Sequence, residues 1–236
     1  FHTLLVVSME SRYKKEGLKT ALGLLGEGQL SLTKWIVIVD HETSPRDFGA
    51  VLRAIRKNFD PSRDFLLLPG TSMDTLDFTS FRMNLGSKMI VDATGDLGPS
   101  PQMDVPTGDL ALTTAVRGVT GARVLEDTLL AVAVAEGDSG RQVLQDVIRR
   151  PHLAGFKMVV AVSQDVELND DVDLLWGFLT RFEPARDVIF PHASLRGICP
   201  AYRGPMAIDA TFKEGYPAPL RMTPEIVERV EENWDR

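Results

Sequence analysis

Lys34-Trp35-Ile36-Val37-Ile38-Val39 is matched further along the chain by Lys157-Met158-Val159-Val160-Ala161-Val162, at an offset of 123 residues. Each run is almost continuously apolar, which is typical of a strand buried on both faces of a parallel sheet. At the same offset, residues 59–64 (FDPSRD) correspond to residues 182–187 (FEPARD). Because a repeat sets the architecture of a chain, we expect two similar folding units in tandem.

Two further pairs of segments extend the repeat. Residues 89–94 (MIVDAT) correspond to residues 206–211 (MAIDAT), and the TLL of residues 3–5 recurs at 128–130. The order and the spacing of the pairs agree along the whole unit. The sequence therefore predicts one copy over residues 1–105, a linker over 106–119 and a second copy over 120–236. Glycine and proline are frequent between the copies, which indicates a turn-rich surface segment.

Each copy alternates strands with helices. The expected strands are residues 4–8, 35–39, 65–68, 89–91, 129–134, 158–162 and 188–190. The expected helices are residues 14–25, from Ser44-Pro45 to Phe59, 142–148 and 169–182. This alternation predicts an α/β fold of two tandem doubly wound βαβαβ domains with mainly parallel sheets. A final helix, capped by Thr223, is expected to turn Ile226, Val230 and Trp234 inward.

Composition narrows the class of protein. The 236 residues carry 33 acidic and 26 basic side chains, a formal net charge of −7. Net acidity with dispersed Lys and Arg gives no electrostatic footprint for nucleic acid, and no apolar run reaches the roughly 20 residues of a membrane helix. The single cysteine, Cys199, excludes an internal disulfide or a cysteine metal cluster and fits a cytoplasmic location. Because the chain opens on a strand at Phe1, we expect it to be part of a longer polypeptide.

Asp40-His41-Glu42 is the first candidate for chemistry. The triplet follows the second strand at its carboxyl end, where doubly wound sheets place their ligands, and its side chains could act as acid, base or metal ligand. The favoured interpretation is a solvated loop that caps the next helix. The glycine-rich segment 23–28 is not a phosphate-binding loop, because its glycines fall at a helix end.

Charged residues recur at two further places in the repeat. Lys34 and Lys157 stand at the same strand start, either as buried catalytic lysines or, in the favoured interpretation, as solvated lysines at the sheet edge. Arg63-Asp64 and Arg186-Asp187 both follow a helix-ending proline. An ion pair that fixes the turn between helix and strand explains both copies without a catalytic role.

Several segments in combination resemble a known family. Residues 37–40 (VIVD), 59–64, 76–80 (LDFTS) and 85–94 (LGSKMIVDAT) are similar to the C-terminal domain of the UbiD family. Its members are prenylated-FMN-dependent decarboxylases that act on polyprenyl-hydroxybenzoate and related aromatic or unsaturated acids. The second copy is more divergent, but its last part, from residues 209–213 (DATFK) to Trp234, also resembles the end of that domain.

The resemblance implies that catalysis and assembly belong to different domains of the enzyme. In such enzymes a preceding split-barrel domain binds prenylated FMN and a metal ion and supplies the catalytic Arg and paired acidic residues, and no position of this chain matches them. The resemblance therefore implies the assembly and active-site-lid region of a decarboxylase, with no catalytic, cofactor or metal ligand of its own. Its expected partners are the flavin-binding domain, of the same parent protein or of a partner subunit, and further copies of itself in a homo-oligomer.

This interpretation makes one structural prediction and names a candidate lid. An exposed apolar surface is expected where the flavin-binding domain or another protomer docks. The candidate lid residues are Thr71, Ser72, Met73 and Leu76, after the third strand, although an ordinary surface connection would also explain that segment. One alternative is a stand-alone, non-catalytic ligand-binding or scaffold protein derived from the same domain. Another is an independent enzyme that uses Asp40 and His41.

Overall fold

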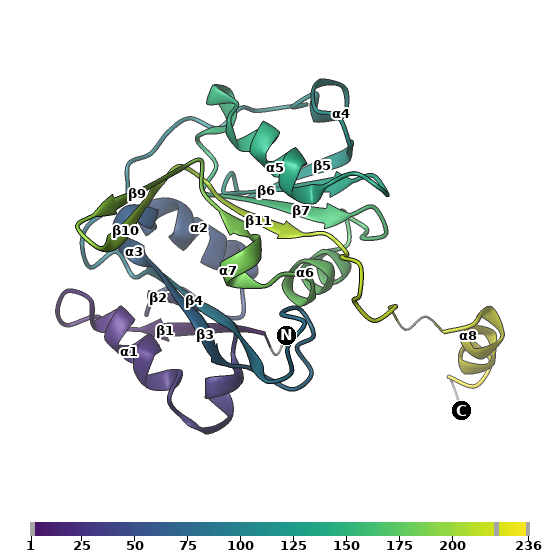
Figure 1. The fold of residues 1–236 in the computed structure, drawn as a ribbon, viewed down its shortest axis with the longest axis horizontal. Coiled ribbons are helices and arrows are strands. Elements are labelled where there is room, and N and C mark those ends of the chain that lie inside the picture. Colours follow the sequence, from purple (N-terminus) through teal and green to yellow (C-terminus); the bar gives the residue numbers. More distant parts are fainter. Residues whose placement is uncertain (1–2, 220–221, 235–236) are drawn as a thin grey trace.

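The computed structural model describes residues 3–219 and 222–234, so the expectation on Phe1 lies outside the described residues. Two sheets lie in separate layers, with helices between them and on their outer faces (Figure 1). The first sheet has the order β1-β2-β4-β3, with β1 (Leu4–Met9), β2 (Trp35–Asp40), β3 (Phe65–Ser72) and β4 (Leu85–Ala93). The second has the order β5-β6-β7-β11-β8, with β5 (Val119–Leu125), β6 (Leu129–Val134), β7 (Met158–Ser163), β8 (Val188–Ile189) and β11 (Met206–Ala210).

Helices cover both faces of each sheet, as a doubly wound fold requires. Outside the sheets lie α1 (Glu16–Leu24) and α5 (Gly140–Ile148), and between them lie α2 (Phe48–Asn58) and α6 (Asp171–Thr180) (Figure 1). One hydrophobic core cluster contains side chains of α2 and α6 together with side chains of both sheets. The two halves of the chain therefore share a core instead of folding as separate globules. Short helices complete the body: η1 (Gly28–Leu32), α3 (Pro61–Asp64), α4 (Leu112–Ala115), η2 (Pro151–Leu153) and α7 (Pro184–Asp187).

The sheets are mainly parallel, which confirms the predicted fold class. Parallel pairs join β1 to β2, β2 to β4, β6 to β7 and β7 to β11, whereas β3, β5 and β8 run antiparallel to their neighbours. The direction of β3 follows from where the chain enters the sheet. Phe65 lies opposite Val91, near the carboxyl end of β4, so β3 must run back toward Leu85. The segment after β3 consequently reaches the amino edge of the parallel strands, not their carboxyl edge.

The helix expected from Ser44 begins later. Its N-cap is Asp47, whose side chain accepts a hydrogen bond from the backbone amide of Ala50 at 2.9 Å. A carboxylate at this position satisfies an amide that would otherwise have no partner in the first helical turn. In the described part of the chain, no helix is long and apolar enough to cross a membrane.

Two elements project from the body at opposite ends of its long axis (Figure 1). One is a hairpin of β9 (His192–Arg196) and β10 (Cys199–Arg203), in a segment for which the sequence predicts no strands. The other is α8 (Pro224–Glu231), which forms where a helix is predicted. The predicted inward orientation of α8 is wrong, because Ile226, Val230 and Trp234 are all exposed. Helix α8 lies apart from both sheets (Figure 1).

Candidate functional site

The segment between β3 and β4 exposes an unusual amount of apolar surface. Over residues 73–84 the chain makes turns, and its exposed side chains include Leu76 (75% exposed), Phe78 (36%), Phe81 (54%) and Met83 (82%). Exposed apolar patches of this kind are typical of surfaces that bind a partner or a ligand. The expected exposed apolar surface is therefore present, on the segment that begins in the candidate lid.

Aromatic rings extend this patch onto the second half of the chain. The buried Tyr216 ring contacts the rings of Phe78, Phe81 and Phe212, with centroid distances of 5.0, 5.3 and 5.7 Å. Phe212 lies two residues after β11, a strand of the second sheet, and is itself 40% exposed. We call the exposed parts of Leu76, Phe78, Phe81, Met83 and Phe212 the aromatic surface.

A buried ion pair between Lys34 and Asp77 anchors the segment of residues 73–84. Lys34 Nζ lies 2.8 Å from Asp77 Oδ2 and donates a hydrogen bond to the backbone oxygen of Phe182 at 2.7 Å. Asp77 Oδ1 also accepts hydrogen bonds from the amide and the hydroxyl of Thr79, at 2.9 and 2.5 Å. Lys34 thus joins the segment to the second half of the chain. The expectation of a solvated Lys34 is wrong: its side chain is 1% exposed, because the segment folds over the sheet edge.

The two charges of this pair stabilise each other. Burial lowers the pKa of Lys34, and the attraction of Asp77 opposes that effect only in part. For Asp77, burial alone would raise the pKa, but the attraction and hydrogen bond of Lys34, with the hydrogen bonds of Thr79, lower it on balance. Asp77 is therefore ionised at neutral pH, and its charge depends on Lys34.

Arg186 holds the same segment from the second half. Its guanidinium donates to the backbone oxygen of Thr79 at 2.9 Å and to the hydroxyl of Tyr216 at 2.7 Å, and it lies 5.2 Å from the ring centroid of Phe81. An ion pair with Asp187 at 2.7 Å orients it. The backbone beneath the aromatic surface is therefore held in place by polar contacts from Lys34 and Arg186.

The four candidate lid residues occupy different environments. Leu76 belongs to the aromatic surface. Thr71 and Ser72 end β3, and Met73 is buried, with its sulfur 3.5 Å from the amine of Lys88. The other members of the surface were not predicted from the sequence. The sequence signal that could have found them lies in residues 76–85 (LDFTSFRMNL). Its large apolar residues have neither the period of a helix nor that of a strand, and they stand among turn-forming Ser, Thr and Asn.

Asp40-His41-Glu42 lies elsewhere, at the carboxyl edge of the first sheet. It lines a cleft of about 660 Å³ together with residues of α2. His41 Nδ1 is 3.0 Å from Asp40 Oδ1, which also accepts the amide of Glu42, and these side chains are solvated. The interpretation as a solvated loop is confirmed, but Asp47 caps the helix in its place. The cleft and the aromatic surface lie at opposite edges of the sheet and do not form one site.

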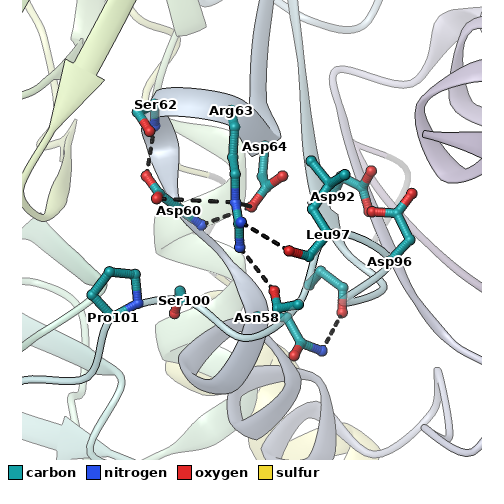
Figure 2. A network of polar contacts seen from close by, with 12 residues as sticks. Asn58, Asp60, Ser62, Arg63, Asp64, Asp92, Asp96, Leu97, Ser100 and Pro101 are labelled. Atoms are coloured by element: carbon teal, nitrogen blue, oxygen red, sulfur yellow. Dashed lines mark hydrogen bonds and ion pairs between the residues drawn. The ribbon is translucent and has the colours of Figure 1, made fainter. Parts of the chain in front are cut away.

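The recurrent Arg-Asp pairs are structural, as the sequence predicts. Arg63 is paired with Asp64 at 3.1 Å and donates to the backbone oxygen of Leu97 at 3.1 Å (Figure 2). It also donates to the backbone oxygen of Gly98 at 2.8 Å. Asp64 Oδ2 also accepts the amide of Asp60, which fixes the turn before β3. Within residues 3–219 and 222–234, no group of three or more His, Cys, Asp or Glu side chains is placed to hold a metal ion.

Comparison with known proteins gives a family. The profile of the 3-octaprenyl-4-hydroxybenzoate carboxy-lyase C-terminal domain matches residues 1–93 and 113–210. A subunit of a 4-hydroxybenzoate decarboxylase from Chlamydia pneumoniae is 31% identical over 237 residues, which cover 99% of this chain and 39% of the relative. An uncharacterized protein from Chlamydia trachomatis serovar D is 32% identical over 242 residues, with coverage of 99% and 39%. The chain thus spans about 39% of the length of these curated relatives.

Solved structures show weaker likeness. The UbiD-class enzyme HmfF from Pelotomaculum thermopropionicum, in complex with FMN, has a TM-score of 0.39 and 13% identity over 69% of this chain and 44% of its own. The closed form of the vanillic acid decarboxylase from Sedimentibacter hydroxybenzoicus has a TM-score of 0.37 and 24% identity over 44% of this chain and 21% of its own.

Proposed function

The chain belongs to the 3-octaprenyl-4-hydroxybenzoate carboxy-lyase (UbiD) family, and from that premise we propose that it is the assembly and lid region of a decarboxylase. In this proposal the aromatic surface docks against a flavin-binding domain, of the same parent protein or of a partner subunit, and closes over its active site. Prenylated FMN and a metal ion belong to that domain and supply the decarboxylation chemistry when bound. The substrate is an aromatic or unsaturated carboxylic acid, and the enzyme acts in the cytoplasm.

The observation that carries the proposal is the exposure of large apolar side chains on a rigid support. Covering one such side chain fully contributes about 1.5–3 kcal/mol, so a few of them suffice to bind a partner domain. Apolar and aromatic groups also suit the ring or alkene of the substrate, while the carboxylate would face the flavin-binding domain. A lid of this composition excludes water from the reacting carbon.

The buried contacts beneath the surface give it a defined shape. Lys34 pairs with the side chain of Asp77, Arg186 donates to the backbone oxygen of Thr79, and the two positive charges are neutralised by Asp77 and Asp187. The apolar side chains therefore project from a fixed backbone, and only their rotamers adjust on docking. The Chlamydia pneumoniae relative adds support, because its name describes it as one subunit of a decarboxylase and so implies further subunits in that protein.

The proposal is tested in the complete decarboxylase by making the aromatic surface polar. Leu76→Asp combined with Met83→Asp is expected to lower kcat/KM at least tenfold, about 1.4 kcal/mol, because the lid no longer closes on an apolar site. The stability of the 236-residue chain alone should stay within about 0.5 kcal/mol of wild type, because both side chains are exposed. Leu22→Asp, at a 45% exposed position of α1, is the matched control.

Two outcomes would contradict the proposal. One is an activity unchanged by the double substitution. The other is an equal loss from the Leu22→Asp control, which would point to a general effect of added charge. Unchanged activity would mean that the aromatic surface takes no part in closing the active site.

A further inference from the structure

Lys157 stands at the same strand start as Lys34, but its amine has no carboxylate partner. The amine of Lys34 lies 2.8 Å from Asp77. The amine of Lys157 instead donates hydrogen bonds to two neutral groups, the hydroxyl of Ser100 at 2.7 Å and the backbone oxygen of Pro101 at 3.0 Å. Among the described residues, no carboxylate lies within the 4.0 Å of an ion pair. The second copy therefore leaves a positive charge uncompensated where the first copy has a buried ion pair.

The difference comes from the chain between the last two strands of each sheet. In the first sheet, the segment between β3 and β4 supplies Asp77. In the second sheet, the chain between β8 and β11 forms the β9–β10 hairpin, and residues 191–204 contain no acidic residue. The hairpin supplies a second cation instead. Arg203 of β10 is exposed, and its guanidinium makes no hydrogen bond or ion pair with the described residues.

Lys157 and Arg203 line the same cleft. Its volume is about 400 Å³, within the range of roughly 300–1,000 Å³ that is typical of small-molecule sites. The cleft lies where β10 contacts α3, beside the linker between the two copies. Its apolar lining includes Pro61, Pro101 and Met103, and Met103 is 55% exposed. The cleft therefore combines two cations with accessible apolar walls.

The lining carries a net positive charge. Of the described lining residues, Asp60 alone is acidic, and its carboxylate accepts the amide of Ser62 at 2.9 Å (Figure 2). Two basic side chains and one acidic side chain leave a net charge of +1. Burial lowers the pKa of Lys157, and the attraction of Asp60 opposes that effect only in part. An anion beside the amine stabilises its charged form.

We propose that this cleft binds a small monocarboxylate with an apolar body. The carboxylate lies between Arg203, which can donate two parallel hydrogen bonds, and Lys157, which acts as a point charge. The apolar body lies against the apolar walls. A dianion such as phosphate fits less well, because those walls offer it no donor and the carboxylate of the lining repels its second charge. The inference does not depend on the proposed function, and the cleft shares no residue with the aromatic surface.

The test is an NMR titration of the isotope-labelled 236-residue chain with benzoate at constant ionic strength. We expect a dissociation constant of about 1 mM, with the largest amide shifts in residues 60–62, 101–103 and 154–157. Benzyl alcohol keeps the ring without the charge, and acetate keeps the charge with almost no apolar body. Each should bind at least tenfold more weakly than benzoate. Inorganic phosphate should not displace benzoate.

Two substitutions test the two cations. Lys157→Gln should raise the dissociation constant of benzoate at least tenfold, and Arg203→Gln at least fivefold. Arg203 is exposed, so its variant should fold as the wild type does and keeps the test decisive if Lys157→Gln alters the linker. Arg196→Gln is the matched control, because Arg196 is exposed on β9 of the same hairpin and lies outside the cleft. It should leave the dissociation constant unchanged.

Four results would overturn the proposal. They are a dissociation constant for benzoate above about 20 mM, equal affinity for benzyl alcohol, displacement of benzoate by phosphate, and equal effects of Arg203→Gln and Arg196→Gln. This proposal and the lid proposal fail independently. Leu76→Asp with Met83→Asp should leave benzoate binding unchanged, and a chain that binds no benzoate could still close over the active site.

Discussion

Replacing Lys34 with Met is expected to destabilise the chain by about 4 kcal/mol at neutral pH. The side chain is 1% exposed, and its amine contacts Asp77 at 2.8 Å and the backbone oxygen of Phe182 at 2.7 Å. Met fills most of the volume, so the loss is electrostatic and not one of packing. Breaking a buried ion pair from one side costs about 3–5 kcal/mol, because the remaining charge is left uncompensated. Loss of the hydrogen bond to Phe182 falls within the same range.

The pH dependence of this loss should have a distinctive sign. In the wild type the pKa of Asp77 lies below its ordinary value of 3.8, so its contribution to stability is present above that pH and is lost as pH falls through the folded-state pKa. Without Lys34, burial dominates and raises that pKa. Asp77 then destabilises the folded state as pH rises through the range above its ordinary value. The free-energy difference between wild type and variant should therefore shrink on acidification.

Urea unfolding followed by circular dichroism at neutral and mildly acidic pH measures these differences. The matched variant combines Lys34→Met with Asp77→Leu, which removes both charges and keeps the volume. It should recover most of the lost stability, because replacing both members of a buried pair by apolar groups is often near neutral. A cost below about 1 kcal/mol for Lys34→Met would show that the ion pair contributes no more than an exposed one. A double variant as unstable as the sum of the single ones would likewise contradict the assigned pairing.

Three further predictions follow from the same contacts. Burial raises the pKa of Tyr216, so the hydroxyl ionises near pH 10 in the unfolded chain and stays protonated there in the folded chain. Wild type should therefore lose stability relative to Tyr216→Phe as the pH rises beyond 10. Urea unfolding at a series of alkaline pH values measures this loss. Gly155→Ala should lower the free energy of unfolding in urea by about 1–3 kcal/mol, because the added Cβ would clash with the backbone oxygen of Asp104. Gly23→Ala, at a helix position with open space around it, should raise the free energy of unfolding by about 0.5–1 kcal/mol. His41→Ala should leave kcat/KM of the complete decarboxylase unchanged. A tenfold loss would instead support the alternative in which Asp40 and His41 take part in catalysis.

Sequence periodicity was a good guide to the sheets and their helices. Continuous apolar runs such as residues 35–39 and 158–162 lie inside β2 and β7, and both are almost fully buried. The Arg-Asp pairs could also be interpreted in advance as structural ion pairs, although the proline before each pair begins a short helix, α3 or α7, and does not end the longer one. These features are local, so neighbouring residues determine them.

Features set by distant contacts were harder to predict. The direction of β3 depends on where α3 delivers the chain, and the burial of Lys34 depends on a segment more than 40 residues away. The hairpin after Phe190 was missed because proline and glycine interrupt its alternation. The orientation of α8 was wrong because an amphipathic pattern shows that a face needs covering, but not which surface covers it.

Docking of the aromatic surface on a flavin-binding domain can be observed by hydrogen exchange of the backbone amides of residues 76–85. The exchange rates are compared between the 236-residue chain alone and the complete decarboxylase. We expect these amides to exchange more slowly in the complete enzyme, while amides of the Asp40-His41-Glu42 loop exchange at the same rate in both. Equal exchange of residues 76–85 in the two samples, with protection appearing on another face, would show that the flavin-binding domain docks elsewhere.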